Sequence, residues 1–138
     1  MNIFINILVP IICFLVGYLF GSIPNAVWVG KVFFHKDPRD YGSHNAGATN
    51  AGRLFGKGIG ILVIILDIAK AVLPLYGAWL FLTYVKFDGV ALMPTARQML
   101  MGDDISMYMI KWPVYWVVTI STMIGHCWPI FAHFKGGK

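Results

Sequence analysis

One stretch of this sequence contains the residue types that bind anions. Residues 41–53 read YGSHNAGATNAGR, a run of small residues and polar donors around a histidine. Closely spaced glycines and alanines let a backbone curl so that its N–H groups point at an anion. Small polar loops also serve as plain turns, so both interpretations remain open at this point. The side chains of this stretch that could contact a phosphate group are those of Ser43, His44, Asn45, Thr49, Asn50 and Arg53.

A second stretch of the same character stands at the end of the chain. The last four residues are Lys135, Gly136, Gly137 and Lys138, which combine two cations with two residues that permit close backbone approach. No closing element follows this basic glycine pair, so it reads as the middle of a motif. We therefore expect the sequence to be a fragment that is truncated at its C-terminal side.

Asp67 and Lys70 form the third feature, because they are charged residues inside an apolar run. Three residues apart on a helix, they share one face and can pair. Ionisable residues in a membrane segment are costly and usually face a bundle interior or a watery cavity. The pair is either a purely structural ion pair or part of a site, and both interpretations predict that this face points inward.

The remaining histidines and cysteines do not indicate a metal or redox site. None of the four histidines has metal-ligand spacing, and Cys13 and Cys127 both lie inside apolar runs. The stretch from Gly52 to Lys57 does not match a nucleotide-binding P-loop. It has one residue too few between its two glycines, and no Ser or Thr follows Lys57. We expect no metal and no cofactor.

These segments must be positioned by membrane helices, since the chain is too apolar for a soluble domain. Of its 138 residues 58% are hydrophobic and 12% are charged, against about 25% charged in soluble domains. Three apolar runs can cross a bilayer: residues 3–34 with a break near Gly21, residues 58–85 and residues 112–134. The predicted fold class is an all-α polytopic membrane protein with about three transmembrane helices, in one membrane-embedded domain spanning residues 1–138.

The distribution of charge predicts the orientation of the chain. The first loop, residues 31–57, holds five cations against two aspartates, whereas the second, residues 86–111, holds three of each. Loops with an excess of Lys and Arg stay in the cytoplasm. We therefore expect a cytoplasmic first loop, an N-terminus outside and a cytoplasmic chain end, so that both anion-binding segments face one compartment.

The segments also match a family pattern in their order. The motifs are Gly21-Ser-Ile-Pro24 with Gly30-Lys31, then Asp37-x-Arg39-x-x-Gly42-Ser43-x-Asn45-x-Gly47-Ala-Thr-Asn50-x-x-Arg53, then Asp67-x-x-Lys70, and last Gly125-His126-x-x-Pro129 with Lys135-Gly-Gly-Lys138. Together they resemble the bacterial acyl-phosphate-dependent glycerol-3-phosphate acyltransferases, the PlsY family. The resemblance implies a multi-pass enzyme of the bacterial cell membrane with about seven helices in the complete fold. One departure is His44, which stands where the family usually has glycine.

The resemblance further implies transfer of a fatty acyl group from acyl phosphate to the 1-hydroxyl of glycerol 3-phosphate, giving lysophosphatidic acid and phosphate in the first step of phospholipid synthesis. It implies substrate binding by the residues named above, with Lys138 over the anionic substrates and His126 or the substrate's own phosphate as proton acceptor. The expected partners are both substrates, membrane lipid and the enzyme that supplies acyl phosphate, with no nucleic acid. The alternative function is an anion transporter or channel, in which Asp67, Lys70 and the polar loop line a permeation path.

Overall fold

A computed structural model describes the chain except for residues 1, 88, 105–107, 109, 111–113 and 137–138. Its elements in chain order are α1 (Asn2–Gly21), α2 (Asn25–Phe34), the short 3-10 helix η1 (Pro38–Asp40), α3 (Ala48–Phe55), α4 (Lys57–Tyr84), β1 (Lys86–Phe87), β2 (Val90–Ala91), α5 (Ala96–Met101), α6 (Tyr115–Cys127) and the 3-10 helix η2 (Ile130–Ala132). The two strands form an antiparallel hairpin that pairs Lys86 with Ala91.

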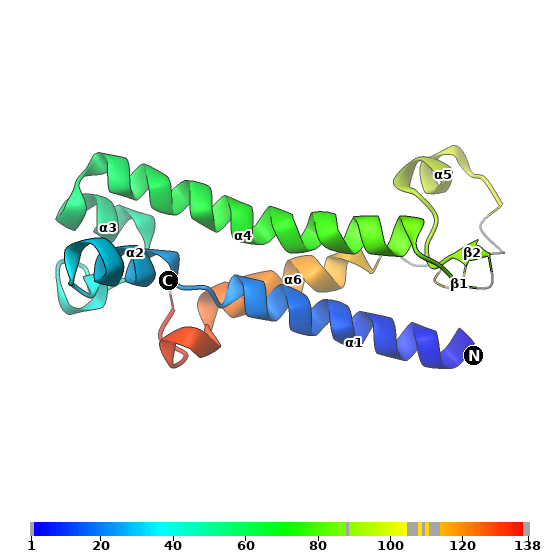
Figure 1. Ribbon diagram of the computed structural model, residues 1–138, viewed down its shortest axis with the longest axis horizontal. Coiled ribbons are helices and arrows are strands. Elements are labelled where there is room, and N and C mark those ends of the chain that lie inside the picture. The colour runs from blue at the N-terminus through cyan, green and yellow to red at the C-terminus, as the bar shows by residue number, and fades with distance from the viewer. Residues whose placement is uncertain (1, 88, 105–107, 109, 111–113, 137–138) are drawn as a thin grey trace.

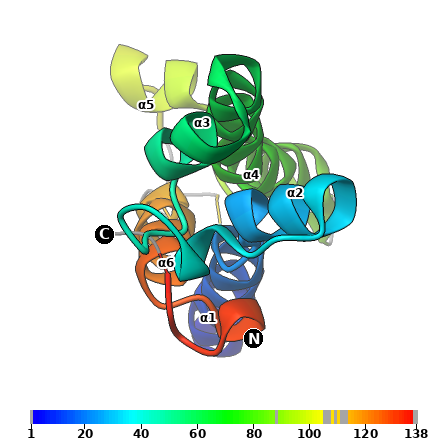
Figure 2. The same cartoon turned by 90° about the vertical axis from the view of Figure 1, so that its left-hand side faces the viewer.

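The three longer helices form an elongated bundle. Helices α1, α4 and α6 run alongside one another, with α6 packed most extensively on α1 (Figure 1). Helices α2 and α3 gather at one end of the bundle together with the C-terminal segment, as the end-on view shows (Figure 2). The hairpin, α5 and the N-terminus lie at the opposite end. The two segments with anion-binding character are therefore at the same end of the molecule.

The first two predicted spans are confirmed. Residues 4–34 and 57–84 are long and apolar enough to cross a membrane. The first is interrupted where the sequence predicted, since α1 ends at Gly21 and α2 begins at Asn25. Pro24 causes this break, because proline has no N–H to continue the helix and restricts the residue before it.

The third predicted span, residues 112–134, is shorter than its apolar run suggested. Helix α6 has 13 described residues, or about 20 Å at 1.5 Å per residue, against about 30 Å of hydrocarbon core. It ends at Cys127 because Pro129 disfavours helical backbone at Trp128. The chain then turns through η2 with His133 in the left-handed region. Residues 111–113 lie outside the described part.

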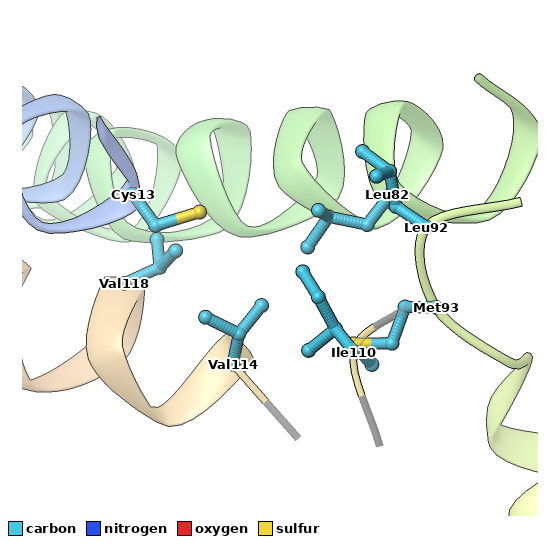
Figure 3. Close-up of a cluster of buried hydrophobic side chains, with 7 residues drawn as sticks. All are labelled: Cys13, Leu82, Leu92, Met93, Ile110, Val114 and Val118. Carbon is cyan, nitrogen blue, oxygen red and sulfur yellow. The ribbon is translucent and has the colours of Figure 1, made fainter. Parts of the chain in front are cut away.

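Apolar side chains cover much of the outside of α1 and α4. Leu15, Ile65 and Leu73 are each more than half exposed, as expected of helices that face lipid. The buried apolar side chains form two clusters at the two ends of the bundle. One, near the hairpin, joins α1, α4 and α6 to the second loop (Figure 3) and comprises Cys13, Leu82, Leu92, Met93, Ile110, Val114 and Val118. The other joins α2, α3 and α4 and comprises Ala26, Val29, Ala51 and Val63.

Helices α1 and α6 touch through their backbones near the break. A Cβ atom on Gly21 would collide with the backbone of Thr122, and one on Gly125 would lie 2.8 Å from the backbone nitrogen of Ser22. Small residues let membrane helices approach this closely, and the contact area replaces the hydrophobic drive that lipid cannot supply. The end of α1 therefore determines where the end of α6 lies.

Gly125→Ala is expected to destabilise the protein by about 1–3 kcal/mol, because the added methyl group overpacks the contact with α1. The matched control is Gly77→Ala in α4, where a Cβ meets nothing within 4 Å. That change should be neutral or stabilising by about 0.5–1 kcal/mol, since alanine favours helix over glycine. Unfolding midpoints of both variants in detergent test this, and equal midpoints would mean that α1 and α6 do not touch here.

Candidate active site

The buried side chain of Asn50 organises the polar loop, residues 41–47, which precedes α3. Asn50 is 1% exposed. Its amide donates to the carbonyl oxygens of Pro38 at 2.7 Å, Tyr41 at 3.1 Å and Asn45 at 3.0 Å, and its oxygen accepts from the N–H of Ser43 at 3.1 Å. One amide thus fixes four points of the backbone. These contacts give Asn50 a positioning role, and its contact with a phosphate stays a prediction.

Asp37 provides a second anchor, just before the loop. Its carboxylate caps η1 by accepting from the backbone N–H of Arg39 at 3.0 Å, and it accepts twice more from the guanidinium, at 3.0 and 2.7 Å. Lys31 reaches the same carboxylate at 3.2 Å. These donors, the Arg39 guanidinium above all, hold the pKa of Asp37 well below its usual range. The carboxylate is therefore charged throughout the physiological range.

Arg39 also joins the polar loop to the C-terminal segment. Its Nη1 donates to the carbonyl oxygen of Ala132 at 3.2 Å, across 93 positions of sequence. Ala132 lies in η2, which is directly followed by the turn that leads to Lys135 and Gly136. This contact brings together the two segments that the sequence identified as anion-binding.

His44 occupies a conformation that favours glycine. Its φ is +56°, and Gly42 two residues earlier has φ +63°. Histidine adopts this region at a cost unless its side chain gains a partner. The partner is the carbonyl oxygen of Arg39, which lies 3.0 Å from Nδ1. With Nδ1 as the donor in this contact, Nε2 is left for other interactions.

The two segments enclose a polar cavity of about 460 Å³. Its lining residues are Asp37, Arg39, Asp40, His44, Ala132, His133, Lys135 and Gly136. Two carboxylates, those of Asp37 and Asp40, offset the two fixed cations, Arg39 and Lys135, in this lining. The two histidines add ring nitrogens that can donate to an anion.

An apolar groove of about 590 Å³ runs between α4 and α6. Its apolar wall includes Ile64, Ile68, Ala71, Val72 and Leu75 from α4 and Met123 from α6. The same lining also includes Asp67, Lys70 and His126. The groove is therefore suited to a hydrocarbon chain that carries a polar group.

A narrow junction separates the groove from the polar cavity. It holds about 10 Å³, room for roughly one water molecule. The junction shares Asp67, Lys70 and His126 with the groove, and Gly136 with the polar cavity. An apolar compartment and a polar compartment thus meet beside His126 and Gly136.

The predicted pair of Asp67 and Lys70 is confirmed. Lys70 Nζ lies 2.9 Å from Asp67 Oδ1, and the lysine side chain is 7% exposed. The pair faces the junction and the groove, as both interpretations of the sequence required.

The other predicted residues divide into four groups. His44, Lys135 and Gly136 line the polar cavity, and His126 lies at the junction. Ser43 and Asn45 belong to the loop that Asn50 holds. Thr49 and Arg53 are exposed on α3 and are not among the residues that line these three cavities. Gly137 and Lys138 lie outside the described residues.

Sequence reasoning did not assign Asp37, Arg39, Asp40 and His133 to the site, although they line the polar cavity. One local signal was available: an Asp followed by Pro and a donor two residues on is a capping pattern, which fixes the direction in which the chain enters the polar loop. The contact from Arg39 to Ala132 had no local signal, since it depends on the tertiary fold.

Comparison with known proteins assigns the chain to a family. The sequence model described as "Glycerol-3-phosphate acyltransferase" matches residues 11–138. The chain belongs to the glycerol-3-phosphate acyltransferase family. It is 40% identical over 128 residues to the glycerol-3-phosphate acyltransferase of Enterococcus faecalis, covering 93% of this chain and 46% of that protein. The acyltransferase of Klebsiella pneumoniae subsp. pneumoniae is 37% identical over 126 residues, covering 90% and 47%.

Two solved structures resemble this glycerol-3-phosphate acyltransferase family member. Both are crystal structures of PlsY (YgiH), described as an integral membrane glycerol 3-phosphate acyltransferase. The glycerol 3-phosphate form has a TM-score of 0.63 and 29% identity, and the lysophosphatidic acid form has 0.60 and 27%. Each match covers 93% of this chain and 50% of the other. The fold is that of an all-α polytopic membrane protein, and the chain spans about half the length of the curated relatives it matches.

Asn50→Asp is expected to destabilise the polar loop, because a carboxylate cannot donate to the three carbonyl oxygens that the amide now serves. Leaving buried acceptors unpaired costs about 1–3 kcal/mol each. Hydrogen exchange of residues 41–47 should become faster, and the unfolding midpoint should fall. Thr49→Ala, an exposed change one residue away on the same helix, is the control and should leave both unchanged. Unchanged exchange in Asn50→Asp would contradict the anchoring role.

Proposed function

We propose that this chain is part of an enzyme that transfers a fatty acyl group from acyl phosphate to the 1-hydroxyl of glycerol 3-phosphate. The products are lysophosphatidic acid and phosphate. The observation that carries the proposal is the meeting of an apolar groove with a polar cavity at His126 and Gly136. The names of the similar proteins, and the two ligands named for the similar crystal structures, support the same reaction.

In this proposal each of the two compartments binds one of the two substrates. The acyl chain lies in the groove between α4 and α6, so that its acyl phosphate group reaches the junction. Glycerol 3-phosphate occupies the polar cavity, with its phosphate near His44 and Lys135. This arrangement converts an encounter of two substrates into a reaction within one assembled site.

Acyl phosphate is a mixed anhydride with a good leaving group, so the demands on the protein are modest. The 1-hydroxyl oxygen attacks the carbonyl carbon, the new C–O bond forms, and the bond to the phosphate oxygen breaks. The phosphate leaves with the electron pair, and the hydroxyl proton passes to His126 or to a substrate phosphate. No acyl-enzyme forms, and positioning with stabilisation of negative charge provides the rate enhancement.

Each site residue takes its role from its position. Gly136 permits close approach of the backbone to the phosphoryl group, and His44 and Lys135 contribute donors to the polar cavity. Ser43 and Asn45 offer donors from the loop that Asn50 holds. Thr49 and Arg53 remain proposed substrate contacts on the motif resemblance, although they are not among the residues that line these cavities. Asn50, Gly137 and Lys138 keep the roles that the motif resemblance implies, and the last two lie outside the described residues.

The proposed enzyme works at the inner face of the bacterial cell membrane. The loop with the cationic excess carries the site, so we place it in the cytoplasm and the N-terminus outside. Residues 1–138 form a single membrane-embedded domain in this account. Its further partner is an enzyme that makes acyl phosphate, since that substrate must be supplied in activated form.

The transporter alternative would use the same buried charges as part of a permeation path. Membership of the acyltransferase family favours acyl transfer over permeation. The two functions also differ in their chemistry, which an assay separates.

The complete protein, purified in lipid, is expected to release phosphate from palmitoyl phosphate only when glycerol 3-phosphate is present. Lysophosphatidic acid should form in equal amount, because each transfer releases one phosphate. Phosphate release and product can be measured in the same reaction. Uptake of glycerol 3-phosphate into vesicles without phosphate release would contradict the proposal and favour transport.

The KM for glycerol 3-phosphate is expected to rise about tenfold in His44→Gly, because the polar cavity loses a side chain that can donate to the substrate phosphate. Glycine tolerates the positive φ of residue 44, so the loop should keep its conformation. His35→Gly is the matched control, because His35 also has a positive φ and is not among the residues that line the polar cavity. An unchanged KM in His44→Gly would remove His44 from the site.

A further inference from the structure

The ion pair of α4, in which Lys70 is buried and Asp67 is partly buried, lies beside the break in the first helix. Lys70 Nζ donates to the carbonyl oxygen of Ile23 at 2.9 Å, as well as to Asp67. On the other side of the pair, the amide of Asn25 donates to Asp67 Oδ1 at 2.9 Å. Each charge of the pair therefore contacts the α1–α2 break, one through the backbone and one through a side chain.

These contacts satisfy groups that the break would otherwise leave unpaired. Ile23 stands directly before Pro24, which has no N–H, and the carbonyls at a helix end lack intrahelical partners. Within a bilayer no water replaces them, so non-helical backbone is tolerated only where protein satisfies it. The carbonyl oxygen of Ile23 accepts from Lys70 and from the N–H of Asn25, which occupies both of its lone pairs.

The position of the break is transmitted to His126. Gly125 packs with its backbone against the end of α1, next to Tyr18 and Ser22. The hydroxyl of Tyr18 also donates to the carbonyl oxygen of Trp128 at 3.0 Å. His126 therefore lies in the sequence between two residues, Gly125 and Trp128, that contact the end of α1. His126 itself lines the junction together with Asp67 and Lys70. Any shift of the α1 end therefore moves His126 relative to Asp67 and Lys70 of α4.

We propose that Lys70 and Asp67 are positioning residues, which hold the α1–α2 break in the conformation that places His126 at the junction. Lys70 acts by donating to the carbonyl oxygen of Ile23, and Asp67 acts by accepting from Asn25. For this role the order of the two charges along α4 matters as much as their mutual neutralisation. The effect on catalysis rests on the proposed acyl transfer. The two hydrogen bonds that tie α4 to the break, from Lys70 to Ile23 and from Asn25 to Asp67, do not.

The sharpest variant is the exchange Asp67→Lys with Lys70→Asp. It keeps an ion pair three residues apart on α4 and the same net charge, but it turns a carboxylate towards the carbonyl oxygen of Ile23. Lys70→Met removes the donor, and Lys70→Arg keeps it. Asn25→Ala is a milder variant that leaves both charges paired, and it serves if Lys70→Met fails to fold.

Two measurements on the complete protein in lipid test the proposal. The first is kcat and KM for glycerol 3-phosphate. Lys70→Met and the exchanged pair should lose about a hundredfold in kcat, the loss that a displacement of about 1 Å at a reacting group produces, with KM within about twofold of wild type. Lys70→Arg should retain most of kcat, and Asn25→Ala should lose about tenfold, since one contact of the tie remains.

The second measurement is hydrogen exchange of the backbone amides of residues 22–28, which reports on the break and does not depend on catalysis. Exchange should become faster in Lys70→Met, in the exchanged pair and in Asn25→Ala, and stay unchanged in Lys70→Arg. If the wild type transfers no acyl group, the proposed function fails, and this measurement still decides whether the tie exists.

Three results would overturn the proposal. Full kcat in the exchanged pair would mean that the two charges only neutralise each other. A raised KM with normal kcat in Lys70→Met would mean that Lys70 contacts the substrate directly. Unchanged exchange at residues 22–28 in Lys70→Met would mean that the carbonyl of Ile23 does not depend on Lys70.

Discussion

A helix that breaks inside a membrane must have its free backbone groups satisfied by protein, and that constraint governs the arrangement of this chain. The break between Gly21 and Asn25 lets α2 leave the axis of α1 and turn the chain towards the polar loop. Lys70 and Asp67 of α4 satisfy the break from one side, and the backbone of α6 packs on it from the other. Three helices meet at this point, and His126 lies where they meet.

The polar end of the molecule obeys a related rule, because its loop has little apolar surface to bury. Hydrogen bonds from a single buried amide, that of Asn50, hold the loop and bind it to α3. Arg39 then fastens the loop to the segment that carries Lys135 and Gly136. Asn50 and Arg39 therefore shape the polar cavity, which Arg39 lines together with His44 and Lys135.

Local patterns in the sequence were enough to predict the two long helices and the position of the break, but not α3 and α5, which lie in segments that the sequence analysis treated as loops. Apolar runs predicted α1 and α4 to within a few residues, and the glycine and proline of residues 21–24 predicted the interruption. The i, i+3 spacing of Asp67 and Lys70 predicted their pairing. The third span came out too long because hydropathy counted residues beyond Pro129, where the backbone cannot remain helical. The groove and the role of Asn50 were not predictable, since both depend on residues brought together from distant helices.

The central claim is that one junction joins an acyl groove to a phosphate cavity, and an electron-density map of the complete protein tests it most directly. The map would be of a complex with glycerol 3-phosphate and an acyl phosphonate, which cannot transfer its chain. The account predicts the alkyl chain between α4 and α6 beside Ile68 and Met123, with the phosphonate near His126 and Gly136. An alkyl chain outside this groove, or a phosphonate remote from Gly136, would contradict it.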